Sequence, residues 1–232
     1  MLPIRDDQPR YSKSWVTWFL IAINLLIFFF EASLDRRSLN ALLHEFGVIP
    51  THAGAYLAGS HRFPLPVVII PFFTSMFLHG SWMHVIGNMW FLYIFGDNVE
   101  DYLGHFKYLV FYLMSGLIAM GTQVAIYPHS NVPTIGASGA IAGVLGAYFV
   151  LYPRARVLTW FFVFIVYIPA WFVLGEWFVM QFLSGTASLS MAQTGRELGG
   201  VAFWAHVGGF VAGMLMIKLF PERARRSPYA YS

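Results

Sequence analysis

The sequence contains no cysteine, and charged residues occupy only 11% of its 232 positions. Without cysteine, the chain has neither a disulfide framework nor a thiolate-ligated metal site. Soluble domains carry about 25% charged residues, so this chain has too little charge to cover a surface that faces water. A net charge of +3 on so apolar a chain does not indicate a nucleic-acid partner.

Apolar residues are abundant instead, at 58% of the chain, and they occur in long runs. A spanning helix needs roughly 20 mainly apolar residues, so the pattern predicts an all-α membrane protein. One domain, residues 15–220, lies between a short cytoplasmic tail (1–14) and a basic cytoplasmic tail (221–232). Six runs within it are expected to cross the bilayer: residues 15–30, 81–95, 108–126, 135–151, 157–182 and 201–220.

The connection between the first two runs is long and mixed in composition. Residues 32–80 are expected to form an outer loop, partly in the membrane interface. Within it, the apolar stretch 67–78 is broken by Pro71, and we expect it to enter the bilayer as irregular backbone that protein shields from lipid. Ser81 is a suitable N-cap for the second run. The polar residues 96–101 are expected to end that run in water.

Six spans place both termini on one side of the membrane. With that side inside the cell, ten of the 14 lysines and arginines are inside and four are outside, so the positive-inside rule predicts an N-in, C-in topology. The outer loop before the last span is the polar segment 184–200. The chain begins with the acidic residues Asp6 and Asp7, which argues against an organelle transit peptide, and we expect an integral protein of a bacterial inner membrane.

Four polar side chains lie near the outer ends of three runs that cross in the same direction. Ser138 is close to the start of the fourth run and His206 to the start of the sixth. His84 and Asn88 follow the start of the second run and, being four residues apart, share one helical face. At about 1.5 Å per residue, all four side chains are expected at a similar shallow depth below the outer surface.

Small residues predict that the fourth and sixth runs approach closely. The fourth run carries Gly139 and Gly143, and the sixth carries Gly209 and Gly213. Such Gly-xxx-Gly pairs let two membrane helices come into backbone contact. The second pair lies within roughly 60° of His206 around the helix, so the histidine is near the face built for close approach.

These residue types suggest nucleophilic catalysis. A serine hydroxyl is a poor nucleophile until a base takes its proton, and His206 could take it from Ser138 and return it to a leaving amine. The Asn88 amide, a ring N–H of His84 and the backbone N–H of the serine are candidate oxyanion donors. Taken singly, the serine could be a packing residue, the histidine a proton relay and the asparagine a bond between helices.

His79 and His84 could also be metal ligands, but a separation of five residues is a poor spacing on one helical face. We therefore expect no metal and no cofactor. Glu176 is interpreted as a carboxylate at the interface or an acid near a gate, and not as a member of a triad.

Together these residues resemble a rhomboid intramembrane serine protease of the basic six-span type, over roughly residues 15–220. The resemblance implies a rhomboid-like bundle in which Ser138 is the nucleophile, His206 the base, and no acidic residue completes a triad. His84 and Asn88 would line the oxyanion site. The matching positions are Gly136, Ser138 and Gly139; Ala205, His206, Gly209 and Gly213; His79, His84 and Asn88; Gly96, Asp97 and Glu100; and residues 152–156.

The resemblance also implies partners. The expected substrates are transmembrane segments of other membrane proteins, cut near their outer ends, and the surrounding partner is membrane lipid. Trp177 and Phe178 would lie at a lateral gate for substrate. The alternatives are a non-catalytic rhomboid-like protein that binds membrane helices as a chaperone, and a transporter. No internal repeat favours a transporter.

Two positions depart from the family pattern. Some members have a tyrosine or phenylalanine four residues after the nucleophile, where it stacks on the histidine; here that residue is Ala142, so another group must hold the His206 ring. Some members have a Trp-Arg pair in the first loop, whereas here Arg62 follows His61. The docking of that loop therefore does not carry over.

Overall fold

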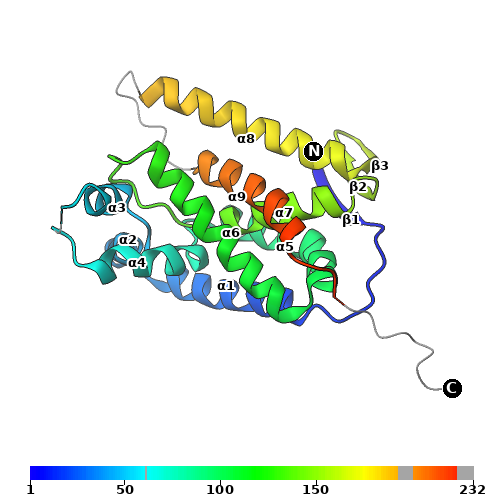
Figure 1. Ribbon diagram of the computed structural model, residues 1–232, viewed down its shortest axis with the longest axis horizontal. Helices are drawn as coiled ribbons and strands as arrows, with labels where there is room; N and C mark the ends of the chain where they lie inside the picture. The colour runs from blue at the N-terminus through cyan, green and yellow to red at the C-terminus, as the bar shows by residue number, and fades with distance from the viewer. Residues whose placement is uncertain (61, 193–200, 224–232) are drawn as a thin grey trace.

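The computed structural model describes residues 1–60, 62–192 and 201–223. Most of these residues lie in helices arranged around α7, whose residues 139–148 are all buried and which contacts α5, α6, α8 and α9 (Figure 1). The helices are α1 (Trp15–Ser33), α2 (Arg36–Phe46), α3 (Pro50–Leu57), α4 (Leu65–Thr74), α5 (Trp82–Leu103), α6 (His105–Ile126), α7 (Ser138–Leu151), α8 (Ala170–Ala192) and α9 (Phe203–Met216). The strands are β1 (Leu2–Asp6), β2 (Arg156–Phe161) and β3 (Phe164–Pro169), and the 3-10 turns are η1 (Ser75–Phe77) and η2 (Ile217–Leu219).

The expected fifth span, residues 157–182, is not a single helix. Its first part forms the antiparallel hairpin β2–β3, β1 pairs with the other edge of β2, and α8 begins only at Ala170. The all-α prediction is therefore wrong in this region. The segment is rich in aromatic and β-branched residues, which favour strands. Val157 and Thr159 are fully buried on one face of β2, but a short apolar run does not reveal this by periodicity alone.

The first 14 residues are an ordered part of the fold. Besides the pairing of β1 with β2, the backbone N–H of Tyr11 and the hydroxyl of Ser12 donate to the carboxylate of Asp101. The buried Glu100 accepts hydrogen bonds from the backbone N–H and the hydroxyl of Thr17 at the start of α1. The N-terminal segment is therefore anchored to the C-terminal end of α5.

This anchoring explains why α5 does not end in water near Gly96, as the sequence suggested. The helix continues to Leu103, and both Asp97 and Asn98 are buried beneath the N-terminal segment. Arg10 forms an ion pair of 3.0 Å with Asp97. The polar residues therefore have partners within the fold and extend the helix instead of terminating it.

The described part of the outer loop, residues 32–60 and 62–80, contains α2, α3, α4 and η1, at the end of the bundle opposite the sheet (Figure 1). Residues 67–78 are largely helical, in α4 and η1, and not irregular as expected. Pro71 removes only one backbone hydrogen bond from α4, and the hydroxyl of Thr74 secures the helix end by donating to the carbonyl of Phe46.

Helix length supports a membrane bundle without giving all six spans. Among the described residues, two helices, α1 and α6, are long and apolar enough to cross a bilayer. A third candidate is α4–η1 together with α5, a pair bent by 76°. The 14 residues of α7 reach about 21 Å at 1.5 Å per residue, less than the roughly 30 Å of a bilayer core.

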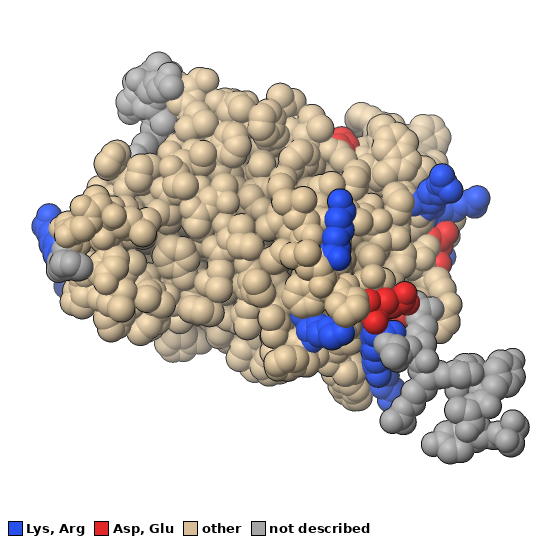
Figure 2. Space-filling view, in the orientation of Figure 1, with Lys and Arg blue, Asp and Glu red and all other residues tan. Residues whose placement is uncertain are grey.

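Other expectations concern the chain ends and loops. Ser81 does cap α5, because its hydroxyl accepts from the backbone N–H of His84. The expected loop 184–200 is helical as far as Ala192, and its remainder lies outside the described residues, as do His61 and the chain beyond residue 223. Most charged side chains visible in Figure 2 lie toward the sheet end, beside a wide uncharged face.

Candidate active site

Ser138 is the first residue of α7, and His206 lies in the first turns of α9. The serine hydroxyl donates to Nε2 of the histidine, with 2.7 Å between Oγ and Nε2. The imidazole is buried, at 8% exposure, whereas the serine is half-buried. A serine and a histidine that are 68 residues apart in sequence are thus directly hydrogen-bonded.

Backbone contact between α7 and α9 produces this proximity. A Cβ atom built on Gly209 would overlap the carbonyl oxygen of Gly139, and one on Gly213 would overlap that of Gly143. Even alanine at these positions of α9 would therefore push the helices apart. The four glycines singled out in the sequence lie at this single crossing.

The second ring nitrogen of His206 has a partner that the sequence did not suggest. Gln181, on α8, accepts a hydrogen bond from Nδ1 at 2.8 Å. Because the amide oxygen can only accept, Nδ1 carries the proton and Nε2 is free to accept from the serine. Gln181 therefore fixes the tautomer that a general base requires.

The indole of Trp177 lies one helical turn before Gln181 and packs beside the imidazole, with ring centroids 5.8 Å apart and planes inclined by 35°. Ala142 is fully buried against α9, and its Cβ lies 3.3 Å from where a Cβ on Gly209 would be, so there is no room there for an aromatic ring. The ring of His206 is therefore held by Gln181 and Trp177. Phe178 instead packs on Phe210, at 4.9 Å between centroids.

One sequence signal could have identified Gln181. It is a polar residue four positions after Trp177 on an apolar helix, so the two share a face. Polar side chains in membrane segments usually point into the protein and have a role. Nothing in the linear pattern, however, links α8 to His206.

Gly136 gives the backbone before α7 its unusual shape. Its φ is +120°, a conformation that other residues rarely adopt, and its N–H donates to the carbonyl of Ser75 at 2.8 Å. A Cβ here would lie 2.7 Å from the ring of His84 and 3.5 Å from Oγ of Ser138. The glycine thus lets the His84 ring approach the backbone beside the serine.

Asn88 is held by a polar chain that begins on α1. Its side-chain amide donates to Nε2 of His79 at 2.9 Å, leaving one further N–H as a donor. The backbone N–H of His79 in turn donates to the buried carboxylate of Glu31. His79 is therefore a supporting residue, and no group of three or more His, Asp and Glu side chains among the described residues forms a metal-binding cluster.

A cavity of about 890 Å³ joins these groups. It is bounded by the α6–α7 connection and by the residues that precede α9, at the end of the bundle away from β1. Its volume falls within the range of small-molecule sites, about 300–1,000 Å³. Glu176 is exposed and does not line it. The polar lining includes His84, Asn88, Gln123, Tyr127, Ser138, Gln181, Ser188 and His206.

The helical membrane bundle thus holds a half-buried serine in a direct hydrogen bond with a buried histidine. Residues 68–223 match the family model for the rhomboid domain. The chain therefore belongs to the rhomboid family.

Individual relatives agree with this assignment. The chain is 29% identical over 218 residues to "Rhomboid-like protein 11, chloroplastic" from Arabidopsis thaliana, covering 94% of this chain and 69% of that protein. It is 32% identical over 146 residues to "Rhomboid protein 1, mitochondrial" from Saccharomyces cerevisiae, covering 61% and 39%. It is 29% identical over 158 residues to "Presenilin-associated rhomboid-like protein, mitochondrial" from Mus musculus, covering 65% and 38%. The aligned part is thus less than two fifths of the latter two proteins.

Proposed function

We propose that this protein is an intramembrane serine endopeptidase that cleaves transmembrane segments of other membrane proteins through a Ser138–His206 dyad. The observation that carries the proposal is the 2.7 Å hydrogen bond between Oγ and Nε2, inside a polar cavity of a rhomboid-family bundle. Family membership supports it, since rhomboid proteins are generally intramembrane serine proteases.

In the proposed reaction, Oγ of Ser138 attacks the scissile carbonyl while Nε2 of His206 takes the hydroxyl proton. The histidine then gives that proton to the leaving amine, and water releases the acyl group from the serine by the reverse sequence. While Nε2 holds the proton, the imidazole is a cation, and the amide oxygen of Gln181 stabilises it by accepting from Nδ1. Gln181 thereby takes the orienting position that an acid occupies in a triad.

The tetrahedral intermediate carries a negative oxygen that needs donors. The free N–H of the Asn88 amide, the His84 ring and the backbone N–H of Ser138 are the proposed donors. The first N–H groups of a helix have no partner within the helix, and the helix dipole favours a negative charge there. All three residues line the same cavity.

Substrate would reach the cavity from the lipid. The groups above lie at the end of the bundle away from β1, so the cleavage site is proposed near one end of the substrate helix, where its backbone unwinds most easily. A six-span, N-in, C-in topology would make this the outer end. Trp177 lines the cavity from α8, whereas the neighbouring Phe178 packs on Phe210. A lateral gate at these two residues is part of the proposal.

The protein is an integral membrane protein, and which cellular membrane contains it has to be decided separately. The relatives named above are chloroplastic or mitochondrial, so they give no support to the bacterial inner membrane expected from the sequence. Localisation by fractionation of the source cells decides between these compartments.

The proposal is tested by cleavage in proteoliposomes that contain a panel of model transmembrane substrates, with products mapped by mass spectrometry. We expect cuts near one membrane boundary by the wild type, none by Ser138→Ala, and unchanged cutting by Ser190→Ala, an exposed serine of α8 outside the cavity. Folded wild-type protein that binds but never cleaves the panel would favour the non-catalytic helix-binding alternative.

A further inference from the structure

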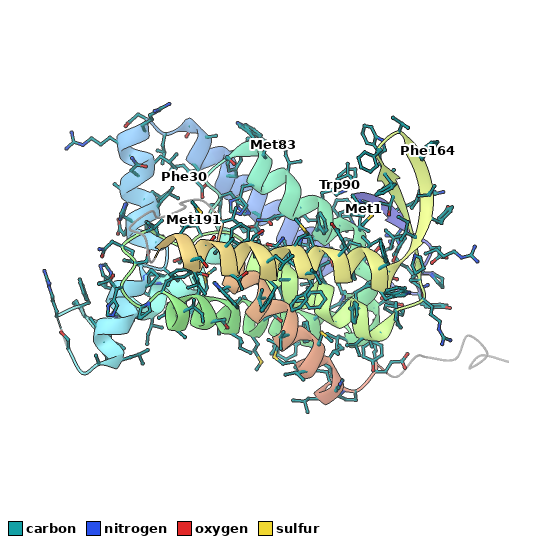
Figure 3. All side chains as sticks on the ribbon, turned by 90° about the horizontal axis from the view of Figure 1, so that it is seen from above. Met1, Phe30, Met83, Trp90, Phe164 and Met191 are labelled. Carbon is teal, nitrogen blue, oxygen red and sulfur yellow. The ribbon has the colours of Figure 1, made fainter. Side chains whose placement is uncertain are left out.

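The turn between β2 and β3 presents a run of apolar side chains to the exterior. Residues 161–164 read Phe-Phe-Val-Phe, and Phe162 and Val163, the two turn residues, are each 82% exposed. Figure 3 shows the hairpin projecting from the side of the helical bundle, with Phe164 in its outer part. Exposed apolar runs of this kind usually mark an interaction surface.

The backbone conformation of the turn is unfavourable for the phenylalanine that occupies it. Phe162 has a φ of +54°, in the left-handed region that two-residue hairpin turns normally fill with glycine or asparagine. A residue chosen only for turn stability would be one of those two. The Phe162 ring packs edge-to-face on Phe161 and is otherwise exposed, so an apolar environment outside the fold explains this residue better than turn stability does.

The apolar surface of the hairpin continues onto the start of α8 and onto α5. Trp160 is half-exposed on β2, and β3 passes directly into α8, where Trp171 and Phe172 are exposed as well. Trp90 of α5, also exposed, lies near Met1 on the same side in Figure 3. In a membrane protein, such aromatic side chains concentrate at the boundary between headgroups and acyl chains.

Basic residues lie at the base of the same hairpin. Arg154 and Arg156 precede and begin β2, and both are exposed. Arg5, on β1, reaches across the sheet to the hydroxyl of Tyr167 on β3. An apolar tip with arginines at its base matches the edge of a bilayer, where the tip would contact acyl chains and the arginines would contact anionic headgroups.

We propose that the β2–β3 hairpin is an interfacial membrane anchor, whose tip at residues 161–164 inserts among lipid headgroups in the leaflet nearest the N-terminal strand. The outer edge of β3 carries unpaired backbone polar groups, which are costly in hydrocarbon, so the strands stay in the hydrated headgroup layer and only the tip side chains reach the acyl chains. Because β3 continues into α8, the anchor holds the base of the helix that carries Gln181. The proposal uses no residue of the Ser–His site and is independent of the proposed protease activity.

The absence of cysteine makes a direct test available. Val163→Cys and, as a control, Pro9→Cys each introduce a single label site; Pro9 is an exposed residue between β1 and α1. Both variants are labelled with an environment-sensitive nitrobenzoxadiazole dye. They are then reconstituted at low protein density into phosphatidylcholine–phosphatidylglycerol vesicles with spin-labelled lipids.

We expect blue-shifted emission at Val163→Cys, with quenching by shallow spin labels several-fold stronger than at Pro9→Cys. In the Val163→Cys background, Phe162→Gly keeps the turn conformation and removes one ring, and it should move the emission toward that of the control. Water-like emission at Val163→Cys, insensitive to the quenchers, would overturn the proposal. Efficient oxidation of unlabelled Val163→Cys into disulfide-linked dimers would also overturn it and assign the tip to a second copy of the chain.

Discussion

Gln181 provides the sharpest test of how His206 is held. Gln181→Leu keeps a side chain of similar size and removes the amide oxygen that accepts from Nδ1. A hydrogen bond to a group that becomes charged contributes about 1.5–3 kcal/mol, and each 1.4 kcal/mol of barrier is a factor of ten. We therefore predict that kcat for cleavage falls by roughly ten- to a hundredfold. KM should change little, because the bond matters most when the imidazole is protonated.

The assay is cleavage of one transmembrane substrate in proteoliposomes over a range of substrate densities, with thermal unfolding measured in parallel. Gln181→Glu is the matched variant, because a carboxylate also accepts from Nδ1 and should retain most of kcat. The reasoning is refuted if Gln181→Leu keeps wild-type kcat, or if the Leu and Glu variants lose activity equally while both unfold at the wild-type temperature.

Three further predictions concern the fold. Gly209→Ala should lower the free energy of unfolding, measured with heat or denaturant, by about 1–3 kcal/mol, since its Cβ overlaps the facing α7 backbone. Gly121→Ala is the control and should not lower it, because its Cβ meets no atom within 4 Å. Glu100→Ala should cost about 1.5–3 kcal/mol in the same assay because it removes the acceptor at the start of α1, and unchanged stability would contradict that role. Asp35 caps the N-terminus of α2, and hydrogen bonds from the backbone and hydroxyl of Ser38 and from the backbone N–H of Arg37 hold its pKa below the usual value. The stabilisation by this cap should therefore be complete above the usual pKa of an aspartate and be lost as pH falls through the lowered pKa. Amide hydrogen exchange of α2, measured as a function of pH, tests this prediction. Asp35→Asn should remove the pH dependence of the protection, and loss of protection in the wild type already near pH 6 would contradict the prediction.

The sequence identified the Ser138–His206 pair for a physical reason. Polar residues are rare in apolar runs, and their distance from the run ends gives their depth, while glycine pairs indicate which helices touch. These signals are local to each run. The side-chain bond from Gln181 is not, because it depends on how α8 is rotated and tilted against α9, which no spacing within either helix specifies.

The errors have a common origin. Apolarity marked residues 157–182 as one span, but it could not distinguish the two short strands at its start, β2 and β3, from a continuation of the helix that follows them. Similarly, Asp97 and its polar neighbours signalled the end of a span, yet the N-terminal segment covers them and provides partners. Such partners come from distant parts of the chain, so local composition gives the wrong answer where tertiary contacts satisfy polar groups.

The central claim is that His206 activates Ser138. Labelling of the purified protein with a fluorophosphonate probe tests it most directly, because the probe forms a covalent bond only with an activated serine. We predict that the wild type is labelled, that Ser138→Ala and His206→Ala are not, and that all three remain folded by thermal unfolding. Labelling that survives in either variant, or a folded wild type that does not react, would contradict the dyad.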